Sequence, residues 1–339
     1  MKYLDPAPAT DNTAERMGVL LVNLGTPDSS SVADVRRYLD QFLSDPRVIE
    51  TPRLIWWPIL HGIILRIRPR RSAAAYRTIW TEQGSPLLHL SRRLSEGLQG
   101  YLDTHSDRPT RVVLAMRYGN PSIADGLEIL RQTGVRRLLV IPLYPQYSAT
   151  TTASVFDAVT AELQRWRRIP ELRFVNQYES DPHYISALET TIRNHWQEYG
   201  APDRLLFSFH GLPKEYADSG DPYPEQCEKT ARHVVNALGL EDDQWALTYQ
   251  SRVGAKEWLR PYTDQTLKKW GADGVGRVDV ICPGFATDCL ETLEEIAVEN
   301  RDYFLNAGGK EYHYIPALND SSTHVELLAR LAQRHTTGW

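Results

Sequence analysis

One histidine and a row of carboxylates have the residue types and spacing needed to move protons or to hold a metal ion. His210 ends an apolar run within 205–213, where neighbouring groups can set its proton affinity near neutrality. Asp288, Glu291 and Glu295 are spaced so that an α-helix carries all three carboxylates on one face. Both features also have structural explanations, since a histidine at a strand end is often only hydrogen-bonded and Asp288 with Glu291 resembles a capping box. Their place in the fold decides between these explanations.

Short apolar runs alternate with helical patterns along the chain, which is typical of βαβ units around a parallel sheet. Eight runs predict strands, four before residue 180 and four after it: 19–24, 111–116, 138–143, 172–177, 204–209, 245–249, 278–282 and 312–315. The sequence therefore predicts two α/β halves of similar size, 18–180 and 181–339. The last predicted helix, 321–333, belongs to the second half or packs back on the first.

Several residues follow predicted strands directly. In open α/β sheets, ligands bind beyond the carboxyl ends of the strands, so these residues are candidates for one site. Leu24 ends the first strand, Arg117 and Tyr118 follow the second, and His210 follows the fifth. Arg117 and Tyr118 have the alternative interpretation of pairing with an acid and packing between helices. Their shared position at strand ends is what favours a site.

Composition excludes several classes of protein. With 38 basic and 43 acidic side chains, the formal net charge of -5 gives no field that favours nucleic acid. The three cysteines form no C-x-x-C pair and are too few for a disulfide scaffold, which favours a reducing, cytoplasmic location. The chain has no G-x-G-x-x-G or P-loop run, no G-x-S-x-G elbow and no paired zinc ligands. Nucleotide binding, serine hydrolysis and a structural zinc site are therefore disfavoured.

Two segments stand apart from the strand pattern. Residues 1–17 are polar and lack the apolar core of a signal peptide, which predicts a flexible N-terminal tail. Residues 53–71, called the lip below, combine aromatic and aliphatic side chains with a cluster of arginines. Their apolar stretch is shorter than the roughly 20 residues of a membrane-spanning helix. The lip is either a peripheral membrane contact or the edge of a ligand pocket, or a buried helical hairpin with arginines at its carboxyl end.

These segments together resemble the ferrochelatase family, and the resemblance covers 18–330, nearly the whole chain. The stretch 18–27 (GVLLVNLGTP) is similar to the opening strand and loop of the family. The stretches 208–213 (SFHGLP) and 283–295 (PGFATDCLETLEE) are similar to its two signature motifs. A further match lies at 249–254 (YQSRVG).

The resemblance implies two Rossmann-like halves, each a four-stranded parallel sheet flanked by helices, with a porphyrin cleft between them. It implies insertion of Fe2+ into protoporphyrin IX to form protohaem, which requires bending the flat ring and removing two pyrrole protons. His210 is implied as catalytic base and metal ligand with Glu291 as its partner, and Asp288 and Glu295 as an acidic path for protons or metal. Porphyrin contacts are implied at Leu24, Arg117, Tyr118, Trp258 and Phe285.

The resemblance also bears on cofactors and partners. Fe2+ is implied as a substrate, with no permanently bound cofactor, and the end of the chain, 334–339, lacks the cysteines that hold an iron–sulfur cluster in the mitochondrial type. Leu24 stands where the coproporphyrin-using type has tyrosine, which favours protoporphyrin IX. The lip resembles the family's mobile cover and implies peripheral contact through 54–71 with the inner face of the membrane. No nucleic-acid partner is expected.

Two other functions compete with this interpretation. A cobalt chelatase of tetrapyrrole biosynthesis usually has a second histidine where this chain has Glu291, which disfavours it. A non-catalytic haem or porphyrin carrier needs the same apolar surface but gains nothing from His210 beside a row of carboxylates. An enzyme loses activity in His210→Ala while it still binds porphyrin, and a carrier has no activity to lose.

Overall fold

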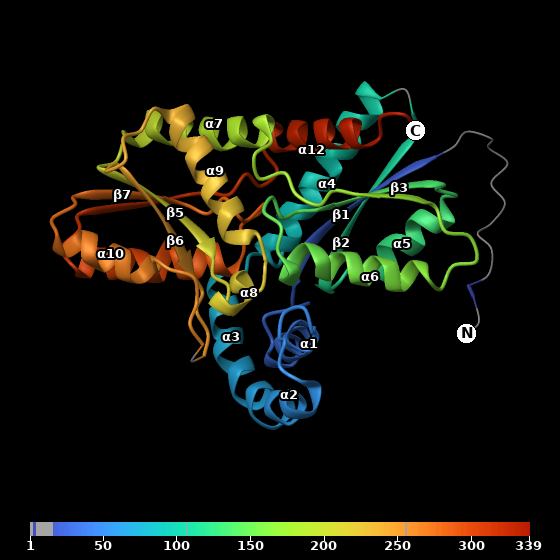
Figure 1. Ribbon diagram of the computed structural model, residues 1–339, viewed down its shortest axis with the longest axis horizontal. Helices are drawn as coiled ribbons and strands as arrows, with labels where there is room; N and C mark the ends of the chain where they lie inside the picture. Colours follow the sequence, from blue (N-terminus) through green and yellow to red (C-terminus); the bar gives the residue numbers. More distant parts are fainter. Residues whose placement is uncertain (1–2, 5–15, 107, 255) are drawn as a thin grey trace. The chain divides into compact units, whose positions relative to one another are not determined.

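The structure, a computed structural model, describes residues 3–4, 16–106, 108–254 and 256–339. The chain divides into two compact units (Figure 1). The sequence predicts a boundary near residue 180, and in the structure the chain passes from unit 1 to unit 2 between Gln177 and Tyr178. The last helix belongs to unit 1. Unit 1 consists of Met1–Tyr144, Ala149–Gln177 and Asp320–Trp339, and unit 2 of Pro145–Ser148 and Tyr178–Asn319.

Most of the predicted tail, 1–17, lies outside the described residues, which begin with 3–4 and 16–17. Leu4 donates its backbone N–H to the carbonyl oxygen of Arg165 at 2.9 Å. This hydrogen bond attaches the first described residues to unit 1.

Unit 1 is built on a parallel sheet with the strand order β2-β1-β3-β4. Its strands are β1 (Met17–Thr26), β2 (Thr110–Gly119), β3 (Arg137–Pro142) and β4 (Glu171–Phe174). The residues from Val19 to Val22 are 0% exposed, as expected for an apolar strand covered on both faces. One face of the sheet packs on α5 (Ile123–Gln132) and α6 (Ser154–Leu163) through a core that includes Leu20 and Leu127. α4 (Pro86–His105) packs on β1 and β2.

The helices of unit 1 begin and pack as their sequences predict. Ser31 caps the start of α1, and Ser122 forms a capping box with Asp125 at the start of α5. A side chain at Gly97 of α4 would come within 2.9 Å of Val325, so the glycine lets α12 pack closely on α4. The described helices outside the lip are α1 (Val32–Leu43), α4 (Pro86–His105), α5 (Ile123–Gln132), the π-helix η2 (Ala149–Ala153), α6 (Ser154–Leu163) and α12 (Ser322–His335).

The lip is one continuous helical segment. It comprises α2 (Arg53–Ile59), the π-helix η1 (Leu60–Ile64) and the start of α3 (Leu65–Ile79). Figure 1 shows α2 and α3, in blue, standing away from the sheet of unit 1. Leu54 is 93% exposed and Trp57 is 65% exposed, so the alternative of a buried hairpin is wrong. The segment continues through a π-helical turn instead of reversing, and its inner side, with Leu60 and Leu65, is buried.

Unit 2 has the same strand arrangement as unit 1, in the order β6-β5-β7-β8. Its strands are β5 (Arg204–His210), β6 (Trp245–Gln250), β7 (Arg277–Ile281) and β8 (Glu311–Ile315). Its helices are α7 (Pro182–Tyr199), α8 (Lys214–Asp218), α9 (Tyr223–Leu238), α10 (Thr263–Ala272), the π-helix η3 (Glu291–Asn300) and α11 (Arg301–Asn306). α10, η3 and α11 share a core with the sheet, and α7 packs on α9. The eight predicted strands are all present, with ends shifted by at most three residues.

No helix in the described part of the chain is both long and apolar enough to cross a bilayer.

Candidate active site

His210 is the last residue of β5, at the carboxyl end of the unit 2 sheet, and its side chain is partly exposed. Its Nδ1 atom lies 2.8 Å from the carbonyl oxygen of Gly211. Because a carbonyl oxygen only accepts hydrogen bonds, we assign the proton to Nδ1 and the lone pair to Nε2. His210 can therefore accept a proton, or bind a metal ion, through Nε2.

Two of the predicted porphyrin contacts lie in the surroundings of His210. The ring centroid of Phe285 is 6.4 Å from that of His210. A side chain at Gly211 would come within 2.8 Å of the Gln250 carbonyl oxygen and 3.2 Å of the Trp258 ring, so only glycine fits between them. Phe285 and Trp258 are both partly exposed, which leaves aromatic surface available to a flat apolar ligand.

Glu291 opens η3, a ten-residue π-helix where the sequence predicts an ordinary helix. π-helical turns are rare and occur often at functional sites. At the end of η3, the side-chain amide of Asn300 donates to the backbone carbonyl oxygen of Glu295 at 2.8 Å. Glu295 lies five residues before Asn300 in the chain. Glu291 and Glu295 are both partly exposed and lie close to one turn apart, so they form a pair of neighbouring carboxylates.

Asp288 does not lie on the helix with Glu291 and Glu295, so the expectation of three carboxylates on one helical face is wrong for it. It precedes η3, and its buried carboxylate accepts hydrogen bonds from Tyr314 at 2.6 Å and Asn319 at 2.7 Å. Thr292 donates a third, at 2.9 Å. With its oxygens occupied in this way, Asp288 anchors the start of η3 to β8 and to the segment that follows it.

The carboxylate of Glu295 is held by Ser251, which follows β6. Ser251 donates its backbone N–H at 2.7 Å and its hydroxyl to the two carboxylate oxygens. Burial raises the pKa of Glu295 to about 7, although the hydrogen bonds from Ser251 oppose the shift. Because its pKa is about 7, Glu295 can exchange a proton near neutral pH. Its partner Ser251 has a φ of 66°, an uncommon conformation for a residue other than glycine.

Gln250 connects the strands to η3. It is buried, its side-chain oxygen accepts from Ser208 of β5 at 2.7 Å, and its amide nitrogen donates to the carbonyl oxygen of Glu291 at 3.0 Å. Ser208 lies two residues before His210 on the same strand. Gln250 therefore fixes the start of η3 relative to the strand that carries His210.

In unit 1, Arg117 and Tyr118 both bind a residue that the sequence did not single out. Asp45 accepts hydrogen bonds on one oxygen from Arg117 at 2.5 Å, Tyr118 at 2.7 Å and Ser154 at 2.6 Å. Burial opposes ionisation of Asp45, but these donors outweigh it and hold its pKa below the usual value. Arg117 thus pairs with an acid, and Tyr118 packs in the interior with its hydroxyl satisfied. Leu24 alone among the residues of β1 is partly exposed, near the carboxyl end of the unit 1 sheet.

The comparisons with known proteins identify the family. The ferrochelatase family model matches residues 16–336. The chain belongs to the ferrochelatase family. The ferrochelatase of Nitrosococcus oceani is 55% identical to it over 97% of this chain and 89% of its own length. The ferrochelatase of Methylococcus capsulatus is 56% identical over 95% of this chain and 97% of its own length.

Membership of the ferrochelatase family makes the chain a porphyrin metal chelatase, a lyase of haem biosynthesis for which Fe2+ is a substrate. The fold prediction is confirmed by the two four-stranded parallel sheets. A solved structure of SirB from Bacillus subtilis with Fe3+ has a TM-score of 0.57 to this chain. It is 9% identical, and the match covers 95% of this chain and 96% of that one, so it supports the fold alone.

The sequence analysis assigned no role to three residues that hold proposed site residues in place: Asp45, Gln250 and Ser251. Gln250 and Ser251 lie within the stretch 249–254, which resembles the family, but a glutamine and a serine carry no spacing signal of their own. Asp45 lies in the long predicted helical interval, and its partners Arg117 and Ser154 are distant in the sequence.

Proposed function

We propose that the chain inserts Fe2+ into protoporphyrin IX to form protohaem, with His210 and Glu291 as the catalytic pair. The observation that carries this proposal is the hydrogen bond from Nδ1 of His210 to the Gly211 carbonyl oxygen, which leaves Nε2 as a base or ligand. It is supported by the position of Glu291 at the start of η3, which Gln250 ties to the neighbouring strands.

Metal insertion needs a base because a free-base porphyrin holds two N–H protons inside its ring. His210 takes these protons one after the other through Nε2, because the hydrogen bond at Nδ1 leaves the lone pair on Nε2. Glu291 stabilises the imidazolium that forms and offers an oxygen ligand to Fe2+. Few and weak protein ligands suit a metal ion that must be surrendered to four ring nitrogens. Glu295, whose pKa lies at about 7, then passes protons from the site toward solvent.

We propose that apolar side chains at the strand ends bind the macrocycle and stabilise its distorted form. Leu24 in unit 1, and Trp258 and Phe285 in unit 2, are partly exposed near the carboxyl ends of their sheets. Binding energy that is realised only with the bent ring lowers the barrier to metal entry. Arg117 retains some exposure beside Asp45, so its proposed contact is with a polar edge of the porphyrin.

The lip supports a proposed contact with the surface of a membrane. Its exposed side chains include Leu54, Trp57, Ile63 and Ile67. A hollow of about 290 Å³ in unit 1 lies beside it and is lined by Arg36, Arg37, Asp40, His61, Leu65 and Arg66. Apolar side chains beside cationic ones fit a surface of anionic lipids. Such a contact suits collection of a poorly soluble porphyrin and places the enzyme at the inner face of the membrane.

The test is anaerobic metal insertion with purified protein. Fe2+ or Zn2+ is mixed with protoporphyrin IX, and loss of free-base fluorescence is followed for wild type, His210→Ala and the control His233→Ala, an exposed histidine on α9. We expect turnover in wild type and the control, and none in His210→Ala, with porphyrin binding kept in all three. Turnover only with coproporphyrin would contradict the substrate assignment. No turnover with either porphyrin, with binding retained, would favour a carrier.

A further inference from the structure

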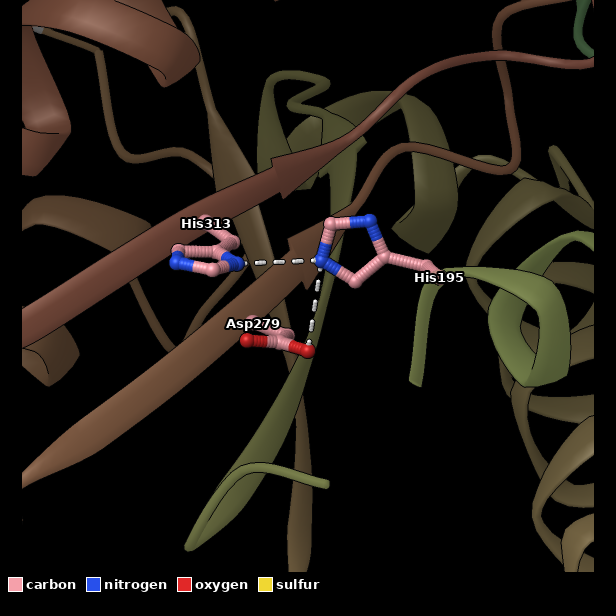
Figure 2. A group of neighbouring side chains, drawn as sticks. All are labelled: His195, Asp279 and His313. Carbon is pink, nitrogen blue, oxygen red and sulfur yellow. Dashed lines mark hydrogen bonds and ion pairs between the residues drawn. The ribbon is translucent and has the colours of Figure 1, made fainter. Parts of the chain in front are cut away.

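Two histidines and an aspartate of unit 2 come together away from the strand ends that carry His210. His195 lies on α7, Asp279 on β7 and His313 on β8. Asp279 and His313 are direct partners in the register of these two parallel strands, and α7 packs on β8. Figure 2 shows the three side chains converging, with one nitrogen of the His195 imidazole joined by dashed lines to His313 and to Asp279.

The distances among these three groups match those among ligands of one metal ion. His195 Nε2 lies 3.2 Å from His313 Nδ1 and 3.6 Å from the nearer carboxylate oxygen of Asp279. The three ligand atoms all lie within 4.8 Å of one another. Tetrahedral ligands bound to one ion at about 2.0–2.1 Å are themselves about 3.3–3.5 Å apart. A metal ion therefore fits with small side-chain adjustments.

The surrounding residues prepare the donors for a cation. His313 Nε2 lies 3.0 Å from Glu311, which favours a proton on Nε2 and a lone pair on Nδ1. A carboxylate on the far nitrogen of an imidazole is the common support of a metal-binding histidine. Asp279 is 0% exposed, whereas the side chains of His195 and His313 are 11% and 21% exposed, so an ion can enter past the imidazoles.

Arg277 is the group that opposes a cation. It donates from Nε to Asp279 Oδ1 at 3.1 Å and from Nη2 to Oδ2 at 3.3 Å, and its Nη2 lies 3.4 Å from His313 Nδ1. Trp196 also donates to Oδ2, at 3.0 Å. With neutral imidazoles, the two carboxylates of Asp279 and Glu311 outweigh the one guanidinium, so the cluster keeps a net negative charge.

We propose that His195, Asp279 and His313 bind a borderline divalent metal ion of the Zn2+ or Co2+ class, with water at the fourth position. Two imidazoles and one carboxylate select such ions over Mg2+ and Ca2+, which prefer oxygen ligands. Without an ion, either His195 Nε2 or His313 Nδ1 carries the proton of the hydrogen bond between them. The metal ion takes the place of that proton. It joins α7 to β7 and β8 and therefore stabilises unit 2. The site is separate from His210 and Glu291.

The three ligands are far apart in the sequence, so no ligand spacing predicts them. Their proximity follows from the pairing of β7 with β8 and from the packing of α7.

The experiment counts tightly bound Zn2+ by elemental analysis after ultrafiltration. The starting protein is His210→Ala/Glu291→Gln, which removes the proposed active-site ligands. We expect it to retain one Zn2+ per chain, to lose that ion when His195→Ala and His313→Ala are added, and to keep it when His233→Ala is added. Zn2+ should raise Tm by several degrees only in proteins that retain both histidines. Equal Zn2+ content in all these proteins would overturn the proposal.

A second measurement does not depend on the folding of any variant. Crystals of the unaltered chain soaked in Zn2+ should show anomalous density bound by His195, Asp279 and His313. Absence of that density, with Zn2+ present elsewhere in the same crystal, would show that the cluster is a network of ion pairs and hydrogen bonds only.

Discussion

The side-chain amide of Gln250 donates a 3.0 Å hydrogen bond to the backbone carbonyl oxygen of Glu291. The carbonyl belongs to the first residue of η3, and the same amide accepts from Ser208 on the strand of His210. One buried side chain thus sets the position of one proposed catalytic residue relative to the strand of the other.

Gln250→Met should lower kcat by about 10- to 100-fold with little change in KM for porphyrin. Methionine has a similar volume but offers neither the donor for Glu291 nor the acceptor for Ser208. Steady-state insertion assays on this variant and on Gln197→Met, an exposed position of α7, measure the effect. An equal loss in both, or a change confined to KM, would show that Gln250 does not position Glu291.

Glu295 should make the stability of the enzyme decrease as pH rises from about 4.5 to about 7. The unfolded chain releases this proton near the ordinary glutamate pKa of 4.5, whereas the folded chain holds it until about pH 7. The folded state therefore binds more protons in this window, and raising the pH favours unfolding by up to about 3 kcal/mol. Urea unfolding at several pH values should show this slope in wild type and a weaker one in Glu295→Gln. Glu326→Gln, at an exposed carboxylate of α12, should keep the slope of wild type.

Asp45→Asn should destabilise unit 1 by about 2–4 kcal/mol, because Arg117 loses its buried counter-charge and three donors lose a charged acceptor. The low pKa of Asp45 gives the sign of the pH dependence. Its ionised form stabilises the fold above the ordinary value of 3.8, so the advantage of wild type over the variant should shrink as pH falls below that value. Thermal unfolding of both proteins at pH 7 and at pH 3.5 measures this. Asp157→Asn, at an exposed ion pair with Arg47, is the control.

The double variant Leu54→Ser/Trp57→Ser should bind vesicles of anionic phospholipid more weakly than wild type while keeping its Tm. Both side chains are exposed, so their loss removes apolar surface from the proposed membrane contact without affecting the core. Vesicle co-sedimentation at low and at high salt separates the two contributions to binding, because high salt screens the electrostatic contribution and leaves the apolar one. Ile129→Ser, at an exposed position of α5, should bind like wild type. Equal binding by all three proteins would rule out the lip as the contact.

The sequence predicted β1, β3 and β5 well because each contains a short, nearly uninterrupted apolar run, and burial on both faces leaves a strong signal. The position of His210 followed from the same rule, since it directly ends such a run. The π-helical geometry of η3 was not predictable, because apolar spacing does not distinguish a π-helix from an α-helix over ten residues. Asp288 was misplaced for a related reason: its partners Tyr314 and Asn319 come from distant segments, and they hold it outside the helix.

The exposure of the lip could not be predicted from the sequence either. A segment that mixes Trp57 and Ile63 with arginines has the composition of either a buried hairpin or a surface contact. What decides between them is whether the chain reverses, and here η1 continues the helical segment from α2 into α3 without a turn.

The assignment of the last helix to unit 1 has a consequence for the order in which the chain folds during synthesis. Every residue of unit 2 has been made once Asn319 is added, whereas unit 1 still lacks Asp320–Trp339. Before these residues are added, α4 lacks the packing of α12 against Gly97. It also lacks the ion pair between Arg93 and Asp320, which are 2.6 Å apart in the complete unit. The half of the protein that begins first is thus the half that is completed last. A chain whose synthesis stops at Asn319 contains every residue of unit 2 but lacks the last helix of unit 1.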